Sequence, residues 1–172
     1  MPFWAKDIKI GSRSINARSE TAATKPMFRS SFEKRRCLIP VDGFYEWERK
    51  AKGKLPHYIY AADNKPLPVA GLWSSWNDPE TDERVLTCTI LTTSPNDLLS
   101  SIHDRMPVVL PRDQWASWLN PDNNDTDALQ QLMVPYPAAL MAEHPVSTLV
   151  NKVANNTADL VAPLATPAVD EP

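Results

Sequence analysis

Proline and glycine usage constrains this chain more than any other feature. Its 172 residues include 17 prolines and only 4 glycines. The apolar stretches are short and end at prolines, as Val108-Val109-Leu110 ends at Pro111. None approaches the ~20 residues of a membrane span, and neither a P-loop nor a dinucleotide-binding glycine motif occurs. The sequence therefore excludes a membrane channel and most nucleotide-dependent enzyme classes.

Short extended segments are interrupted by short helices, with no regular β-α-β alternation. The expected strands are Cys37–Val41, Phe44–Glu48, His57–Tyr60, Val69–Trp73, Val85–Thr93 and Val146–Val150. The expected helices run from Met27 into the Lys34-Arg35-Arg36 cluster, from Ser94-Pro95 through Ile102, over residues 111–119, and from Asp125 or Asp127 to Met133. This pattern predicts one α+β domain with an antiparallel or mixed strand core and peripheral helices. We expect the domain over residues 1–160 and a flexible, Pro/Ala-rich acidic tail over residues 161–172.

Charge is unevenly distributed along the chain. The formal net charge is -3, but residues 1–57 carry +7 and residues 58–172 carry -10. A locally basic surface can bind phosphates even when the whole protein is acidic. The alternative is an ordinary solvated basic helix around Arg29–Arg36, so charge alone does not decide between the two.

Cysteine and histidine usage argues against a disulfide scaffold and a dedicated metal site. The two cysteines are Cys37 and Cys88, and we expect both to be reduced thiols in a cytosolic or nucleoid protein. The three histidines form no HxxxH motif and no CxxC accompanies them. We expect no cofactor. The start of the chain has no basic region followed by an apolar one, so no signal peptide is visible.

Three short segments combine acids, bases and hydrogen-bond donors near turns: residues 16–21, 42–47 and 101–107. On an extended strand Glu46 shares a face with Phe44, and apolar surroundings would raise the pKa of its carboxyl, as suits a general acid or base. His103 precedes Asp104-Arg105, so it is either a helix C-cap or a proton carrier beside a phosphate-binding arginine. Any one of these residues alone indicates a structural role. Together they indicate a site, but spacing does not prove that they converge.

The same segments resemble the SOS response-associated peptidase (SRAP) family. The residues that carry the resemblance are Asn16-Ala17-Arg18-Ser19-Glu20-Thr21, Arg36–Trp47 and Ile102-His103-Asp104-Arg105-Met106-Pro107-Val108. The likeness runs from Met1 to about Asn156. It implies a distorted, barrel-like strand core and a monomeric DNA-damage protein of bacterial or phage origin, associated with the nucleoid. Its expected partner is single-stranded DNA with abasic sites, without metal or membrane.

The resemblance also implies roles for individual residues. Asn16 would orient the nucleophile, Glu46 would act as acid and base around the amine and the sugar aldehyde, and His103 would protonate the opening sugar. Arg18 and Arg105 would hold phosphates that flank the lesion, with Arg29 a weaker candidate. Trp47 would stack on the DNA or shape the pocket. The implied product is a thiazolidine crosslink to the abasic sugar, together with peptidase-like removal of the initiator Met.

The start of this chain departs from the family pattern. Family members carry their nucleophilic cysteine directly after the initiator Met, whereas Pro2 occupies that position here. We expect a chain truncated at its N-terminus, with Pro2-Phe3-Trp4 as the remnant of a family segment. Cys37 and Cys88 cannot replace the nucleophile, because an internal cysteine has no free α-amine. The alternatives are a non-catalytic module that binds single-stranded DNA reversibly and an inactive fragment.

Overall fold

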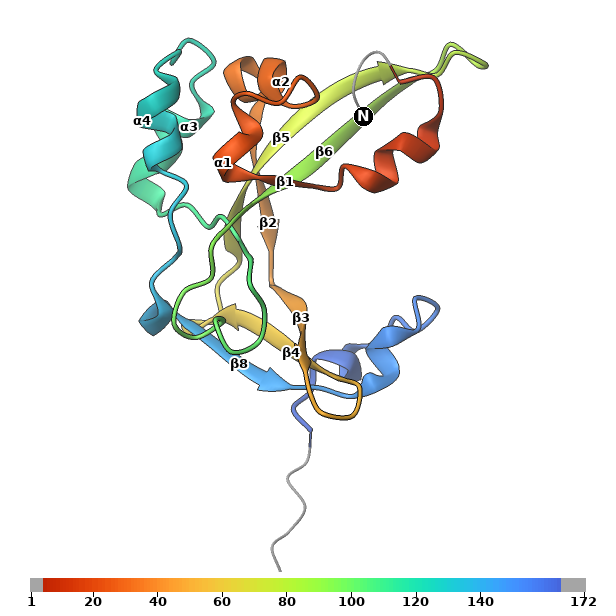
Figure 1. The fold of residues 1–172 in the computed structure, drawn as a ribbon, viewed down its shortest axis with the longest axis vertical. Helices are drawn as coiled ribbons and strands as arrows, with labels where there is room; N and C mark the ends of the chain where they lie inside the picture. Colours follow the sequence, from red (N-terminus) through yellow and green to blue (C-terminus); the bar gives the residue numbers. More distant parts are fainter. Residues whose placement is uncertain (1–4, 165–172) are drawn as a thin grey trace, which may run out of the picture.

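The computed structural model describes residues 5–164 and forms two sheets flanked by short helices (Figure 1). The expected N-terminal remnant and residues 165–172 of the expected tail lie outside the described residues. The first sheet contains β1 (Asn16–Arg18), β2 (Arg36–Val41), β5 (Leu67–Asn77), β6 (Arg84–Thr93) and β7 (Met106–Pro107). The second contains β3 (Gly43–Arg49), β4 (Lys54–Ala61) and β8 (Met141–Pro145). The helical segments are η1 (Ile8–Arg13), α1 (Ser19–Ala22), α2 (Arg29–Lys34), η2 (Arg112–Gln114), α3 (Trp115–Leu119), α4 (Thr126–Gln131), η3 (Ala138–Leu140), η4 (Thr148–Asn151) and η5 (Ala158–Val161).

The strand core confirms the predicted α+β class. The first sheet has the order β1-β6-β5-β2, with β1 parallel to β6 and the other pairs antiparallel, and the second has the order β3-β4-β8. Only Asp42 separates β2 from β3, so the chain passes from one sheet directly into the other, as the orange segment of Figure 1 shows. Within residues 5–164 the two sheets remain separate and do not close into a barrel.

Two apolar clusters hold these layers. The first lies between the first sheet and the helices and includes Phe32, Leu72, Leu91, Trp118 and Leu129. The second joins the two sheets and includes Ile59, Val69, Leu99, Met106 and Met141. The second cluster matters for function, because Leu99 and Met106 bracket residues 100–105 and fix that segment between the sheets.

Several expected elements differ from the structure. Residues 97–102 form consecutive turns rather than a helix, because the i→i+4 bonds Ser100 N to Asn96 O and His103 N to Leu99 O do not follow one another. The last strand is β8, before Val146, and the residues expected to form it lie largely in η4. The first residues of the expected tail over 161–172 still contact β8, because Leu164 N donates to Pro145 O.

The expected basic helix is shorter than predicted, and Arg36 is not on it. Arg36 begins β2 and is buried, with its guanidinium donating to backbone carbonyls that include Trp118 O at 2.7 Å and Phe32 O at 2.6 Å. A buried guanidinium needs such acceptors, and helices α2 and α3 and the loop after α3 supply them. Part of the basic charge in the N-terminal third is therefore structural and unavailable to a ligand.

Candidate active site

A cleft of about 380 Å³ opens between the two sheets, and it contains most of the expected site residues. We call it the central cleft. Its lining includes the predicted residues Asn16, Arg18, Glu46, His103 and Arg105. The sequence alone left their convergence open, and the fold provides it. Phe44, Tyr45, Thr92 and Met106 complete much of the wall and were not predicted as site residues.

The C-terminal end of β6 organises the central cleft. On one side β1 pairs with it in parallel, with Asn16 opposite Ile90 and Arg18 opposite Thr92. On the other side residues 106–110 run between β6 and β5, where Val108 N donates to Leu91 O and Ala70 N donates to Val108 O. Segments distant in the sequence are therefore held by main-chain hydrogen bonds beside one strand end.

The second sheet contributes Glu46, which faces His103 across the cleft. Its Oε2 lies 3.8 Å from His103 Nε2, and the Glu46 side chain is 20% exposed. Burial raises the pKa of the Glu46 carboxyl, and the neighbouring His103 opposes this only in part. The rise agrees with the expectation from the shared strand face with Phe44. A carboxyl whose pKa is raised is protonated more readily than an ordinary one, as suits a group that exchanges protons with an imidazole.

Main-chain contacts orient the His103 ring. Arg105 N donates to Nδ1 over 3.1 Å, and Asp104 Oδ1 lies 3.3 Å from the same nitrogen. Arg105 O also lies 3.2 Å from Nδ1, so these contacts hold the ring through Nδ1 and leave Nε2 facing Glu46. The arrangement directs two groups that can exchange protons, a carboxyl and an imidazole, at one space in the cleft.

Arg105 is engaged by Glu20, a residue that the sequence analysis gave no role. Its Nη1 bonds Glu20 Oε1, its Nη2 lies 2.9 Å from Glu20 Oε2, and Nη2 also donates to Thr92 O. The pair lowers the pKa of Glu20. The Arg105 guanidinium therefore links Glu20 of α1 to the end of β6 in this structure, and its contact with phosphate stays a prediction. The signal for Glu20 was its place in the same short motif as Arg18.

The remaining predicted DNA contacts are distributed over three places. Arg18 is exposed at the cleft, and within residues 5–164 its side chain makes no hydrogen bond or ion pair. Trp47 lies next to the cleft in a second cavity, and its indole Nε1 donates to Asn151 Oδ1 over 2.7 Å. Arg29 begins α2 and lines neither cavity. The structure thus offers Arg18 as the available cation of the central cleft.

A second histidine, His57 on β4 of the second sheet, is held differently. The buried His57 places Nδ1 2.6 Å from Glu143 Oε2 and Nε2 3.1 Å from Glu48 Oε2, which ties β3, β4 and β8 together. Lys50 lies 2.5 Å from the other oxygen of Glu48. Within the part of the chain that the structure describes, no group of three or more His, Cys, Asp or Glu side chains is arranged to hold a metal ion.

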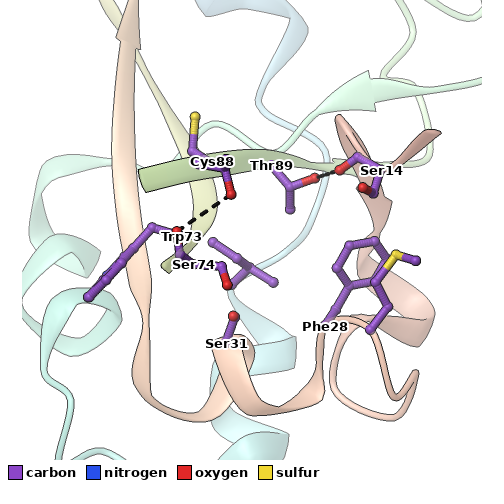
Figure 2. Close-up of a pocket in the computed structure, with 10 residues that line it drawn as sticks. Ser14, Phe28, Ser31, Trp73, Ser74, Cys88 and Thr89 are labelled. Atoms are coloured by element: carbon purple, nitrogen blue, oxygen red, sulfur yellow. Dashed lines mark hydrogen bonds between the residues drawn. The ribbon is translucent and has the colours of Figure 1, made fainter. Parts of the chain in front are cut away.

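The cysteines and the small cavity near Cys88 do not offer an alternative site. Burial, with a smaller contribution from Cys88, raises the pKa of Cys37 to about 11, so its thiol stays protonated at neutral pH. The cavity in Figure 2, between Phe28 and Cys88, has only about 20 Å³, room for one water. The Thr89 hydroxyl at its wall already donates to Ser14 O (Figure 2).

The fold and the cleft define a mixed α/β protein with a carboxyl and an imidazole facing each other near an exposed arginine. The family model of SOS response associated peptidase (SRAP) matches residues 1–153, and the chain belongs to this family. None of the helices within residues 5–164 has the length and apolar character of a membrane span.

Named relatives and solved structures agree with this assignment. The chain is 48% identical over 162 residues to the abasic site processing protein YoqW of Bacillus subtilis, covering 94% of this chain and 72% of that protein. It is 32% identical to the abasic site processing protein HMCES of Gallus gallus, covering 95% of this chain and 55% of that protein. A crystal structure of a protein from Bacteroides thetaiotaomicron superposes with a TM-score of 0.86 at 30% identity, covering 95% and 73% of the two chains.

Proposed function

We propose that this chain binds single-stranded DNA and holds an abasic site in the central cleft. The observation that carries the proposal is the Glu46–His103 pair, which faces one space in a cleft also lined by Asn16 and Arg18. Membership of the SRAP family and similarity to proteins named abasic site processing proteins support the choice of lesion.

The cleft suits the ring-opened form of an abasic sugar. This form carries an aldehyde at C1′ and a phosphate on each side, and it has no base to accommodate. Arg18 would contact a flanking phosphate, which fixes the register of the strand without reading its sequence. His103 Nε2–H would donate to the sugar oxygen as the ring opens, and Glu46 would exchange protons with the group that attacks the aldehyde.

The covalent step that fits this site is thiazolidine formation with an aminothiol. The amine adds to the aldehyde carbon, the oxygen leaves as water, and the thiol sulfur adds to the resulting imine carbon. Glu46 and His103 would transfer the protons of these steps, and Asn16 would hold the amine. Both cysteines of the 172 residues, Cys37 and Cys88, are internal and lack a free α-amine. The covalent nucleophile is therefore not assigned to either of them.

A binding titration tests the first part of the proposal. Fluorescence anisotropy would compare a labelled single-stranded oligonucleotide that contains a stable tetrahydrofuran abasic analogue with the same strand containing thymine. We expect a preference of about tenfold or more for the analogue, equivalent to ~1.4 kcal/mol. Arg18→Ala should weaken both complexes and reduce the salt dependence by about 0.7 in log–log slope. Equal affinities for the two strands would exclude the proposed lesion specificity.

A chemical assay tests the second part. Free L-cysteine supplies the amine and thiol, and mass spectrometry follows its capture by an aldehyde abasic site in single-stranded DNA. We expect the 172-residue protein to accelerate capture over the DNA alone. A second measurement, the intact mass and N-terminal sequence of the protein from its own cells, shows whether an N-terminal cysteine supplies the nucleophile there. Unchanged capture kinetics would leave reversible binding as the function.

A further inference from the structure

His103 contributes to the walls of two cavities, the central cleft and the second cavity, which has about 340 Å³. Its two ring nitrogens meet different carboxyl groups. Nε2 lies 3.8 Å from Oε2 of Glu46, which lines the central cleft, whereas Nδ1 lies 3.3 Å from Oδ1 of Asp104, which lines the second cavity. The imidazole therefore stands between a carboxyl of the cleft and a carboxyl outside it.

Nδ1 has a partner for either of its protonation states. The backbone N–H of Arg105 lies 3.1 Å away and is a donor, which suits an unprotonated Nδ1. Arg105 O at 3.2 Å and Asp104 Oδ1 at 3.3 Å are acceptors, which suit a protonated Nδ1. The ring can therefore gain or lose a proton at Nδ1 without turning, while Nε2 stays directed at Glu46.

Asp104 is the member of this group that water reaches most easily. Its side chain is 83% exposed, against 39% for His103 and 20% for Glu46. Within residues 5–164 its ion-pair partner is His103. Its charge is still felt in the cleft, because the pKa of Glu46 is raised mainly by burial and further by Asp104. Asp104 is thus coupled to the cleft and open to solvent.

The chemistry proposed for the cleft releases a proton. An α-amine is mostly protonated at pH 7, so the aminothiol arrives as an ammonium. The ammonium, the thiol and the aldehyde together give a thiazolidine, one water and one H⁺. Of the four hydrogens on nitrogen and sulfur, two leave in the water, one stays on nitrogen and one has to reach the solvent. A site that performs this reaction needs a path for that proton.

Resting on the proposed function, we propose that Asp104 is a positioning residue that acts through His103 and relays this proton from the central cleft to solvent. A neutral ring with its proton on Nδ1 takes up at Nε2 the proton that Glu46 has removed from the ammonium. The Nδ1 proton then passes to Asp104 Oδ1, and Asp104 gives it to water. The ring is neutral again, with its proton on Nε2, and Nδ1 accepts from Arg105 N.

Chemical rescue tests the relay. The assay is the capture of free L-cysteine at an aldehyde abasic site in single-stranded DNA, at pH 7 in dilute buffer. Asp104→Asn keeps the size of the side chain but removes its exchangeable charge. We expect protein-dependent capture to slow about tenfold, less than for loss of a group that contacts the reacting atoms. Added acetate, with ionic strength held constant by sodium chloride, should restore most of the loss, because a small carboxylate can accept the proton at Nδ1.

A matched control comes from the same run of turns. Asp97 is exposed and lines neither cavity, so Asp97→Asn should capture at the wild-type rate with or without acetate. Capture by the DNA alone with acetate is subtracted throughout, and thermal melts show whether both variants are folded. The relay is wrong if Asp104→Asn matches the wild type in dilute buffer, or if its loss is not recovered by acetate. A wild-type protein that does not accelerate capture overturns the proposed function, and the relay with it.

Discussion

Two glutamates on one face of β3 lie two residues apart and meet two histidines in opposite ways. Glu46 faces His103 at 3.8 Å across the central cleft, and burial raises the pKa of its carboxyl. Glu48 lies 3.1 Å from His57, and its hydrogen bonds to Lys50 and His57 lower its pKa. A third group, Glu143, occupies the other nitrogen of His57 at 2.6 Å.

The difference separates a histidine with one ring nitrogen open to a ligand from a histidine whose two ring nitrogens both have partners. Both ring nitrogens of His57 are occupied, so the ring has no free position for a ligand. His103 is fixed at Nδ1 by the main chain and keeps Nε2 directed at the cleft. Chemistry needs groups whose protonation state can change, whereas stability needs groups whose partners are fixed. The same strand therefore supplies one carboxyl that is open to the cleft and one that is held by fixed partners.

The largest expected effect distinguishes the two glutamates by rate. Glu46→Gln removes the group that we propose exchanges protons in the cleft and should slow protein-dependent cysteine capture at the abasic site about 10²-fold. Glu48→Gln is the matched control on the same strand face and should change the rate less than about twofold, because it lines neither cavity. Capture followed by mass spectrometry measures both. Equal losses in the two variants would remove the distinction.

The next effect distinguishes the two histidines by stability. His57→Ala leaves Glu48 and Glu143 facing an emptied, buried position and should lower the free energy of unfolding by about 3 kcal/mol. His103→Ala removes a side chain that is 39% exposed and should cost less than about 1 kcal/mol. Urea unfolding followed by circular dichroism gives both values. A larger loss for His103→Ala than for His57→Ala would contradict the assignment.

A smaller effect tests the Glu20–Arg105 ion pair, because Arg105 contacts the His103 ring through its backbone N–H. Glu20→Gln weakens the hold on the Arg105 guanidinium, while the backbone N–H of Arg105 still contacts His103. We expect capture to slow roughly three- to tenfold through misplacement of the ring. Stability should change by less than about 1 kcal/mol, since Glu20 is half-exposed. If the capture rate is unchanged while the free energy of unfolding clearly falls, Glu20 has a structural role only.

The smallest effect is a difference in pH dependence. Because the pKa of Glu46 is raised in the folded state, its ionisation removes stability as pH rises from about 4.5 through the folded value. Glu46→Gln should therefore raise Tm by about 1 to 2 °C at pH 7 and leave it unchanged at pH 4. For Glu48 the pKa is lowered, so its contribution is present above about 4.5 and is lost as pH falls. Glu48→Gln should lower Tm at pH 7, and thermal melts at both pH values show whether the signs are opposite.

The sequence predicted local features of the site better than their assembly. Alternation along β3 placed Glu46 beside Phe44 and predicted the raised pKa, because that argument needs only neighbours on one strand. It did not predict that Glu20 binds Arg105, since no local pattern relates two side chains from distant segments. Arg36 illustrates the same limit. Its place in a basic run suggested a surface helix, whereas it lies buried at the start of β2 and donates to a carbonyl of the distant helix α3.

The prediction of the fold also succeeded where the signal is local and failed where distant segments pair. Strands rich in β-branched residues, such as β6, were predicted nearly to their ends because their composition is a local signal. β8 was displaced to Met141–Pro145, because its pairing with β4 depends on a contact that composition does not encode. The turns that carry His103 were predicted as a helix from Ser94-Pro95. Asn96 instead begins them, with its side-chain oxygen accepting from Leu99 N.

The most direct test of the central cleft uses the three histidine side chains as reporters. Imidazole NMR signals of His57, His103 and His144 would be assigned by substitution and followed while single-stranded DNA with a tetrahydrofuran site is added. We expect the His103 signal to shift and the His57 signal, from a ring with both nitrogens occupied, to stay in place. A shift of His57 with an unmoved His103 would contradict the central claim that the abasic site lies between Glu46 and His103.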